Sequence, residues 1–306
     1  MVVVFGSINV DFVMRVERLP APGETVLGGS YFLVQGGKGA NQACAAALAG
    51  ESKVAMIGCT GHDDWARFAV ERLREAGVDL SPVSAVEEPT GCASICVDSD
   101  GENAIAVASG ANMALRASQI PASLLGPDAV LVLQMETPPE ENFAAVRRAH
   151  TAGARVVLNV APAAPVPGDV LDAVDYLVVN EIEARMVASR LNIADDQPQV
   201  LAARLSEAHA LVCIATLGAR GAIAAGHGKT VHVDSPKVTP VDTTGAGDAF
   251  VGALAASLDA GAGLDETLAR AVVAGALTCE RPGAQSSFPA RADIERRYAL
   301  HPAPSP

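Results

Sequence analysis

The chain has 306 residues, of which half are hydrophobic and 19% are charged. This composition is typical of a compact globular protein and excludes a disordered, collagen-like or coiled-coil chain. The formal net charge of −13 argues against a general binder of nucleic acid or of anionic membranes. A chain of this length can bury about 75% of its unfolded surface, so its core needs no disulfide or structural metal.

The N-terminus and the cysteines suggest where the protein resides. Residues 1–6 have no basic stretch of the kind that opens an export signal, and they lead directly to Asn9 and Asp11. No apolar run reaches the roughly 18 residues that a membrane span needs. The six cysteines form no C-x-x-C pair, which favours reduced thiols. We therefore expect a cytoplasmic protein that binds neither membrane nor nucleic acid.

Short apolar runs rich in β-branched residues alternate with Ala-rich segments of helical length along most of the chain. Strands are predicted at 2–5, 53–57, 129–134, 155–159, 175–179, 211–215, 222–225 and 230–233. Helices are predicted at 39–49, 63–76, 139–152, 181–191, 199–208, 247–259 and 265–280. Continuous apolar runs are typical of strands that are buried on both faces. The alternation predicts an α/β fold with a doubly wound, mostly parallel sheet and helices on both faces.

Two segments, 12–36 and 90–109, carry strand patterns without an intervening helix. The second contains the turn-rich sequence 98–103, which is typical of a hairpin connection. Both segments are predicted to form a small antiparallel excursion from the main sheet, acting either as a lid or as an ordinary edge hairpin. Because no linker or repeat interrupts the chain, we expect residues 1–306 to form a single domain with this β lid inserted.

The strongest chemical motif is the run from Asp242 to Phe250, in which two glycines precede an Ala-rich segment. Gly245 to Gly247 are predicted to form a loop and the first turn of a helix, where exposed backbone amides can bind an anion. Asp248 would then lie beside a bound phosphoryl group and could accept a hydroxyl proton. The alternative is an aspartate that only stabilises the start of the helix.

Two polar motifs lie near the N-terminus. Residues 36–43 are rich in glycine and feed a helix, but they match neither a Walker A loop nor a dinucleotide-binding fingerprint. They offer backbone amides and the Asn41 side chain to a hydroxylated ligand, or form a plain glycine-rich turn. Asn9 and Asp11 alternate after the first strand, so both side chains point to one side. Such a pair suits vicinal sugar hydroxyls, although it also fits a capped turn.

Two further loops follow predicted strands. Residues 180–183 (Asn-Glu-Ile-Glu) and 216–221 (Thr-Leu-Gly-Ala-Arg-Gly) could hold a nucleotide, although each signal is weak when taken singly. The chain has no H-E-x-x-H motif and no G-x-S-x-G elbow, and its six histidines share no motif. Metalloprotease and serine-hydrolase chemistry are therefore not supported.

Taken in order, these motifs resemble the ribokinase-like (PfkB) family of carbohydrate and nucleoside kinases. The resemblance extends over nearly the whole chain, from Gly6 to Pro289. Residues 242–253 look like the C-terminal signature of the family, and residues 36–43 look like its N-terminal one. The resemblance implies a kinase that uses ATP and Mg²⁺, is activated by K⁺, and forms a homodimer through its β lid.

The resemblance also implies roles for individual residues. Asp248 would be the catalytic base, with an anion hole formed by Gly245, Ala246 and Gly247. The implied sugar-binding residues are Asn9, Asp11, Gly37, Lys38, Gly39, Ala40, Asn41, Glu136 and Asp248. The implied nucleotide-side residues are Asn180, Glu183, Thr216, Leu217, Gly218, Ala219, Arg220, Gly221, Gly247 and Val272. Val272 departs from the family, where a polar residue is often found at this position. The implied K⁺ loop comprises Asp242, Thr244, Thr278, Arg281, Gly283 and Ser287.

The polar residues of the predicted site favour a small, fully hydroxylated acceptor. The predicted lid carries only three aromatic rings, whereas a nucleobase usually requires an apolar wall. We therefore expect phosphorylation of the 5-hydroxyl of D-ribose. The alternatives are a related kinase that acts on a nucleoside, fructose or another sugar, and a sugar-binding pseudokinase without activity.

Overall fold

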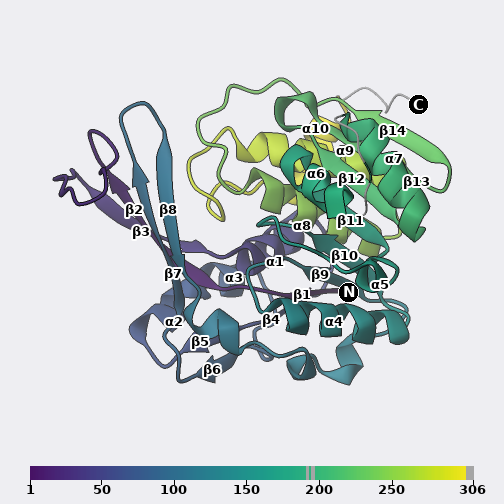
Figure 1. Ribbon diagram of the computed structural model, residues 1–306, viewed down its shortest axis with the longest axis horizontal. Coiled ribbons are helices and arrows are strands. Elements are labelled where there is room, and N and C mark those ends of the chain that lie inside the picture. The colour runs from purple at the N-terminus through teal and green to yellow at the C-terminus, as the bar shows by residue number, and fades with distance from the viewer. Residues whose placement is uncertain (191–192, 194–196, 301–306) are drawn as a thin grey trace.

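The computed structural model describes residues 1–190, 193 and 197–300, and its centre is a sheet of eight described strands (Figure 1). These strands are β1 (Val2–Phe5), β4 (Val54–Ile57), β9 (Val130–Leu133), β10 (Arg155–Asn159), β11 (Tyr176–Asn180), β12 (Val212–Thr216), β13 (Ala222–Gly226) and β14 (Lys229–Val233). Their order across the sheet is β14-β13-β12-β11-β10-β9-β1-β4. Pairing is parallel from β4 to β12, and β13 and β14 are antiparallel. The predicted mostly parallel sheet is confirmed.

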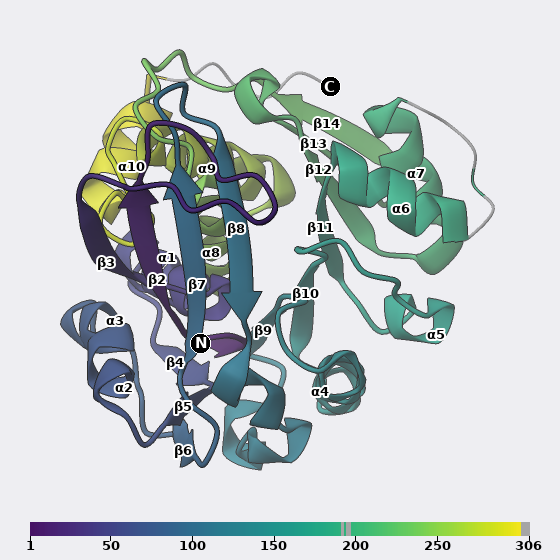
Figure 2. The same cartoon turned by 60° about the vertical axis from the view of Figure 1, so that its left-hand side comes forward.

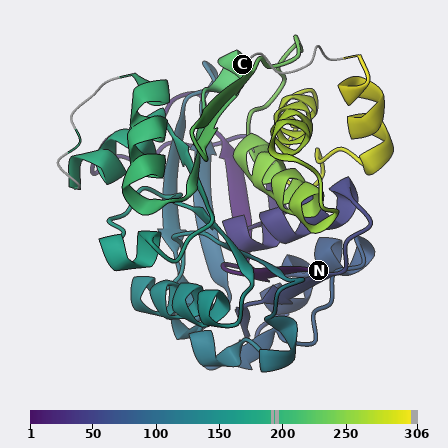
Figure 3. The same cartoon turned by 90° about the vertical axis from the view of Figure 1, so that its right-hand side faces the viewer.

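Helices cover both faces of this sheet (Figure 3). One face packs against α1 (Lys38–Ala49), α8 (Ala246–Asp259) and α9 (Leu264–Thr278), with α10 (Arg291–Tyr298) lying against α9. The other face packs against α4 (Pro139–Thr151), α5 (Gly168–Leu171), α6 (Glu181–Arg190) and α7 (Pro198–His209). Successive strand residues enter opposite cores, as for Val2 and Val3. The unbroken apolar runs therefore reflect two buried faces.

A second sheet of four described strands projects from the main body (Figures 1 and 2). Its strands, in order, are β3 (Tyr31–Gly36), β2 (Asn9–Arg15), β7 (Gly91–Val97) and β8 (Asn103–Ala108). The pairs β2–β3 and β7–β8 are antiparallel hairpins, as predicted. The two hairpins join through a parallel β2–β7 pair, which the antiparallel prediction did not anticipate. Strand β2 begins at Asn9, closer to β1 than the predicted boundary at residue 12.

Other local details differ from the sequence-based expectations. The helix predicted at 63–76 is two helices, α2 (Asp64–Ala69) and α3 (Glu71–Glu75), separated at Val70. Val70 itself leaves the helical conformation (φ −106°, ψ 2°), and both Val70 and Leu73 are buried in the core. The helix predicted at 181–191 is present over Glu181–Arg190, and position 191 lies outside the described residues.

Several short elements were not predicted. They are the strands β5 (Cys59–Gly61) and β6 (Ser84–Val86), the helices α5 and α10, and 3₁₀ turns at Gly110–Ala114, Ala117–Gln119, Ala122–Leu124 and Gly218–Arg220. Among the described helices, none combines the length and the apolar character that crossing a bilayer requires.

A close crossing of α1 and α8 places the start of both helices near the site described below. A Cβ atom on Gly252 of α8 would lie 2.5 Å from Cβ of Ala45 and 2.6 Å from the backbone nitrogen of Ala46. Only glycine allows the two helix backbones to approach this closely. The crossing brings Asn41 and Gln42, in the first turn of α1, into hydrogen-bonding contact with Asp248 in the first turn of α8.

Candidate active site

From β1 the chain adds β4 on one side of the sheet and β9 to β14 on the other, so the strand order reverses between β1 and β9. A crevice opens at the carboxyl ends of the two strands at such a point. Ser7 and Asn9 follow β1, and Gln134 and Glu136 follow β9. Beside this crevice lies a cavity of about 210 Å³. It is lined by Lys38, Asn159, Ala161, Val178, Val179, Asn180, Glu183, Thr216, Gly245, Gly247, Asp248 and Val251. Residues far apart in the sequence thus converge on one site.

Asp248 is buried, with 7% of its surface exposed, and both of its carboxylate oxygens accept hydrogen bonds. Nδ2 of Asn41 donates to Oδ2 at 2.9 Å, and Nε2 of Gln42 donates to Oδ1 at 3.0 Å. Burial raises the pKa of Asp248, while the Lys38 charge and these two hydrogen bonds oppose the rise. In return, the negative charge of Asp248 raises the pKa of Lys38. The carboxylate is thus oriented and more basic than an exposed one, as a general base requires.

The first turn of α8 supplies the predicted anion-binding amides. Gly245 has φ +77°, and a Cβ atom there would lie 2.9 Å from Cβ of Ala284, so both conformation and space require glycine. The amide of Ala246 donates to the carbonyl of Thr243 over a long 3.3 Å. Space beside Gly247 is open, because a Cβ atom there would meet nothing within 4 Å. The geometry favours Gly247 as the more accessible amide for an anion.

The glycine-rich segment at the start of α1 is fixed to Ser7 and Glu136. Oε2 of Glu136 accepts hydrogen bonds from the Ser7 hydroxyl at 2.6 Å and from the Lys38 backbone amide at 2.9 Å. Nζ of Lys38 lies 3.9 Å from the other oxygen of Glu136. Gly37 has φ +85°, and a Cβ atom there would lie 2.8 Å from the nitrogen of Asn9. The loop therefore lies tightly over the end of β1.

Asn9 and Asp11 belong to β2 of the second sheet and face the same site. Oδ1 of Asn9 accepts a hydrogen bond from Asn112 at 2.7 Å, which orients the amide. Burial and the negative charge of Glu136 raise the pKa of Asp11 to about 7. Among the described residues, Oδ1 of Asp11 is buried without a hydrogen-bond partner. A buried unpartnered carboxyl oxygen is well suited to a ligand hydroxyl.

Asn180 and Glu183 form a reciprocal cap at the start of α6. Oδ1 of Asn180 accepts from the Glu183 amide at 2.9 Å, and Oε2 of Glu183 accepts from the Asn180 amide at 2.7 Å. Both residues line the cavity. Burial raises the pKa of Glu183. The cap accounts for the Asn-x-x-Glu spacing structurally and also directs a carboxylate toward the cavity.

The remaining predicted nucleotide residues are dispersed. Of residues 216–221, only Thr216 is among the residues lining the cavity, and Arg220 pairs with Glu181 at 2.6 Å. Leu217 and Gly221 are buried, whereas Gly218 and Ala219 are exposed. Val272 is 5% exposed and packs within the core on α9, outside the lining of this cavity.

The residues of the predicted K⁺ loop adjoin the start of α8. Oδ1 of Asp242 accepts from the amide and hydroxyl of Thr244 at 2.9 and 2.7 Å, and Oδ2 accepts from the Gly283 amide at 2.8 Å. Although burial raises the pKa of Asp242, these hydrogen bonds hold it below its usual value. The buried Thr278 and Ser287 hydroxyls each donate to a local carbonyl, and Arg281 is exposed. Asp242 thus ties residues 242–244 to Gly283.

Side-chain metal binding has no strong candidate in the part of the chain that is described. No group of three or more His, Cys, Asp or Glu side chains is placed there to hold a metal ion. A monovalent cation at the Asp242 loop would therefore rely largely on backbone carbonyl oxygens. The available donors are oxygen atoms, which suits K⁺ in chemical type.

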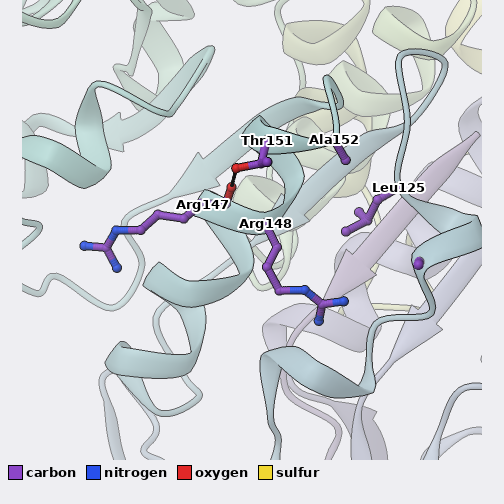
Figure 4. A pocket seen from close by; sticks show the side chains of 6 residues that line it. Leu125, Arg147, Arg148, Thr151 and Ala152 are labelled. Carbon is purple, nitrogen blue, oxygen red and sulfur yellow. Dashed lines mark hydrogen bonds between the residues drawn. The ribbon is translucent and has the colours of Figure 1, made fainter.

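A larger surface pocket, of about 430 Å³, lies between α4 and the turn Ala122–Leu124 (Figure 4). Arg148 donates there to the carbonyls of Ala117 and Ile120, and Arg147 pairs with Asp169 at 2.5 Å. Both arginines are therefore already engaged. None of the predicted site residues lines this pocket.

The structure adds buried polar residues that sequence reasoning did not assign. Those that contact predicted site residues or their direct partners include Ser7, Gln42, Asn112, Gln134, Asn159 and Gln285. Gln42 lies inside the 36–43 motif and Ser7 lies two residues before Asn9, so these positions carried a signal. Asn112, Gln134, Asn159 and Gln285 lie outside the motifs at 36–43 and 242–250.

The chain is similar to known carbohydrate kinases over nearly its full length. A family model described as pfkB family carbohydrate kinase matches residues 1–291. Ribokinase of Haemophilus influenzae is 37% identical over 295 residues, covering 94% of this chain and 95% of that protein. Ribokinase of Schizosaccharomyces pombe is 36% identical and covers 98% of both chains.

Solved structures give the same result. Ribokinase of Thermotoga maritima superposes with a TM-score of 0.91 at 32% identity, over 98% of this chain and 99% of that one. Arabidopsis thaliana ribokinase, complexed with ribose and ATP, has a TM-score of 0.86 at 31% identity, over 97% and 98% of the two chains. A Burkholderia thailandensis nucleoside kinase with inosine shares the fold at 22% identity, with a TM-score of 0.82. The family resemblance predicted from the motifs is confirmed.

The raised pKa of Asp11 predicts how the stability of the ligand-free protein depends on pH. Asp11 keeps its proton in the folded state up to about pH 7, whereas in the unfolded chain it loses the proton near 3.8. Folding then becomes less favourable as pH rises between these values, because the folded state binds more protons. Replacement Asp11→Asn should therefore raise the melting temperature by a few degrees more at pH 8 than at pH 5, since each pKa unit corresponds to about 1.4 kcal/mol.

Asp63→Asn provides a matched control for thermal unfolding at the two pH values. Hydrogen bonds from Thr90 and Ala66 to the Asp63 carboxylate outweigh burial and lower its pKa. Because Asp63 is ionised in both the folded and the unfolded state at pH 5 and at pH 8, its replacement should destabilise the protein equally at the two values. An equal effect of Asp11→Asn at both pH values would show that Asp11 is ionised throughout this range.

Proposed function

The chain belongs to the pfkB family of carbohydrate kinases, and we propose that it transfers the γ-phosphoryl group of ATP to the 5-hydroxyl of D-ribose. The observation that carries this proposal is the buried Asp248 carboxylate beside the open first turn of α8. A base and an anion-binding turn at one point are what phosphoryl transfer to a hydroxyl requires. The ribokinases that are similar over the full chain support ribose as the acceptor.

The sugar lies, in this proposal, between the second sheet and the starts of α1 and α8. The unpartnered oxygen of Asp11 accepts a hydrogen bond from a sugar hydroxyl, and the Asn9 amide, oriented by Asn112, donates one. Asp248 orients the acceptor hydroxyl and takes its proton as the new bond to phosphorus forms. The second sheet acts as a lid that excludes water from the reacting groups.

The nucleotide lies on the side of the cavity formed by Asn180, Glu183 and Thr216. The amide of Gly247 and the Lys38 ammonium stabilise the charge of the transferred phosphoryl group. Mg²⁺ would neutralise the charge of the phosphates when bound, and it prefers oxygen ligands. Glu183 could supply one, because among the described residues only its Oε2 atom accepts a hydrogen bond and Oε1 is left available. Complexes of similar ribokinases with ATP and with ADP support ATP as the donor.

The acceptor assignment is tested with a panel of ribose, 2-deoxyribose, fructose, adenosine and cytidine. Ribose should give the highest kcat/KM, and 2-deoxyribose should be poorer by about 10⁴-fold if Asp11 binds the missing hydroxyl, because a buried polar group is then left unpaired. A coupled assay of ADP release measures the rates. A nucleoside that exceeds ribose, or a preference for fructose, would reject ribose as the acceptor while leaving the family unchanged.

Asp248→Asn tests the base assignment, because asparagine keeps the shape of the side chain but accepts a proton poorly. It should lower kcat by about 10²–10⁴-fold while leaving the protein folded and the KM for ATP close to wild type. An intact fold in thermal unfolding serves as the control. Turnover near the wild-type rate would contradict the role of Asp248 as the base.

A monovalent cation at the Asp242 loop should activate the enzyme. Asp242 and Gly283 lie against the turn that precedes α8, so an ion that orders this loop would also order the anion-binding amides. We expect kcat to rise several-fold in K⁺ relative to Li⁺ or Na⁺, with ionic strength held constant by tetramethylammonium chloride. Equal rates with K⁺, Li⁺, Na⁺ and tetramethylammonium alone would reject the cation site.

We also propose a homodimer that forms through the second sheet. All six residues of β8 are exposed, among them Ile105 (57%) and Val107 (53%), and β8 is an edge strand whose outer side pairs with no other described strand. Sedimentation at micromolar concentration should show a dimer, and a double change of Ile105 and Val107 to Glu should give a monomer. Ile182→Glu, an exposed position outside the sheet, should stay dimeric. A monomeric, fully active wild type would contradict the proposed dimer.

The cytoplasmic location expected from the sequence stays a prediction.

A further inference from the structure

Buried side-chain amides surround Asp248, and their orientations follow from that one carboxylate. An ionised carboxylate only accepts hydrogen bonds, so each neighbouring amide must turn its NH₂ group toward it. Asn41 and Gln42 do so, on opposite oxygens. Their own carbonyl oxygens therefore point away from Asp248.

The next pair of amides continues this polarity. Oδ1 of Asn41 accepts from Nε2 of Gln285 at 3.0 Å, and Oε1 of Gln42 accepts from Nε2 of Gln134 at 2.7 Å. Nε2 of Gln42 also donates to Oδ1 of Asn159 at 3.0 Å. The amide of Asn159 is fixed in turn, because its Nδ2 donates to the backbone carbonyl of Val178 at 3.2 Å. Gln42 is therefore held at both ends of its amide.

This arrangement leaves two polar atoms unsatisfied. The Oε1 atoms of Gln134 and Gln285 have no hydrogen-bond partner among the described residues, although these side chains are only 1% and 2% exposed. Rotating either amide by 180° would place two carbonyl oxygens against each other. The unsatisfied oxygens are thus a consequence of the amide donors being directed inward, toward Asp248.

We propose that Gln42, oriented by Gln134 and Asn159, is a positioning residue that holds Asp248 as a hydrogen-bond acceptor with its remaining lone pairs directed into the cavity. A proton placed on the side of the carboxylate facing Asn41 or Gln42 would meet an N–H group. The proton taken from the acceptor hydroxyl therefore goes to the side that lines the cavity. The proposal rests on the proposed function, since it concerns the base of that reaction.

Charged groups near Asp248 also shift its pKa, and their effect must be separated from that of the Gln42 amide. Lys38 on α1 favours the ionised form of Asp248, whereas Glu136 after β9 disfavours it. The negative charge of Asp248 in turn raises the pKa of Asp11 on β2. Replacing Gln42 leaves these three side chains in place. Because Gln42 is neutral, its contribution also depends little on salt, unlike that of a charged group.

The test is the titration of Asp248 in the ligand-free full chain, followed by carboxyl ¹³C NMR after labelling of the aspartates. Asp248→Asn identifies the resonance by its disappearance. In Gln42→Met the apparent pKa of Asp248 should rise by roughly one to two units, because a hydrogen bond to the charged form is lost. The acidic limb of the kcat profile against pH should move upward by a similar amount.

Two further variants refine the result. Gln134→Met removes the group that orients Gln42 but keeps the direct donor, so it should give a smaller shift in the same direction. Gln119→Met is the matched control, because the Gln119 side chain contacts Arg116 and Cys59 rather than this network. It should leave both the titration and the pH profile unchanged.

A folded Gln42→Met protein with an unchanged Asp248 titration would overturn the proposal. If Gln42→Met does not fold, Gln42→Glu keeps the shape and places two carboxyl groups side by side, so the acidic limb should move further upward. An unmoved limb in that variant would equally overturn the proposal. The NMR titration needs no turnover, so it decides the role of Gln42 separately from whether the wild type phosphorylates ribose.

Discussion

The buried negative charge of Asp248 is the constraint on which the rest of the site depends. A carboxylate removed from water is stable only where opposite charge or hydrogen-bond donors replace its hydration. The chain supplies the Lys38 ammonium, the amides of Asn41 and Gln42, and the start of α8. Three of these groups come from the first five residues of α1. The chemistry of the site therefore requires α1 and α8 to begin at the same place.

That requirement explains features of packing that are remote from any ligand. The helices can meet only because Gly252 leaves no side chain between them, and α8 can begin where it does only because Gly245 accepts φ +77° against Ala284. The loop held by Asp242 and Gly283 supports the same turn from the other side. A change at any of these positions would displace Asp248 without altering a residue of the proposed sugar site.

Much of this could be predicted from the sequence, because the relevant signals were local. Unbroken apolar runs indicated strands buried on both faces, and the glycine motifs at 36–43 and 242–250 indicated two helix starts with exposed amides. The break at Val70 and the parallel pairing of β2 with β7 had no such signal. No glycine or proline near Val70 indicates a helix break there. The β2–β7 pairing depends on how two hairpins far apart in the sequence meet in space.

The amides that contact Asn41 and Gln42 from other parts of the chain could not be predicted for a related reason. Gln285 contacts Asn41 across 244 positions of the chain, and Gln134 contacts Gln42 across 92. A lone glutamine after a strand has no pattern that distinguishes it from a surface residue. Val272 shows the opposite case, since a position suggested by resemblance is a packed core residue on α9.

The second sheet carries part of the proposed sugar site, and this would have a thermodynamic consequence. Asn9 and Asp11 belong to β2, whereas Lys38 and Asp248 belong to helices of the main body, so a sugar bound as proposed would bridge two parts of the molecule. Strand β8, at the outer edge, is joined to β2 through a continuous ladder of backbone pairs across β7. A contact on β8 that favours one orientation of the second sheet relative to the main body must then change the affinity for sugar. By reciprocity, bound sugar must change the strength of that contact by the same factor.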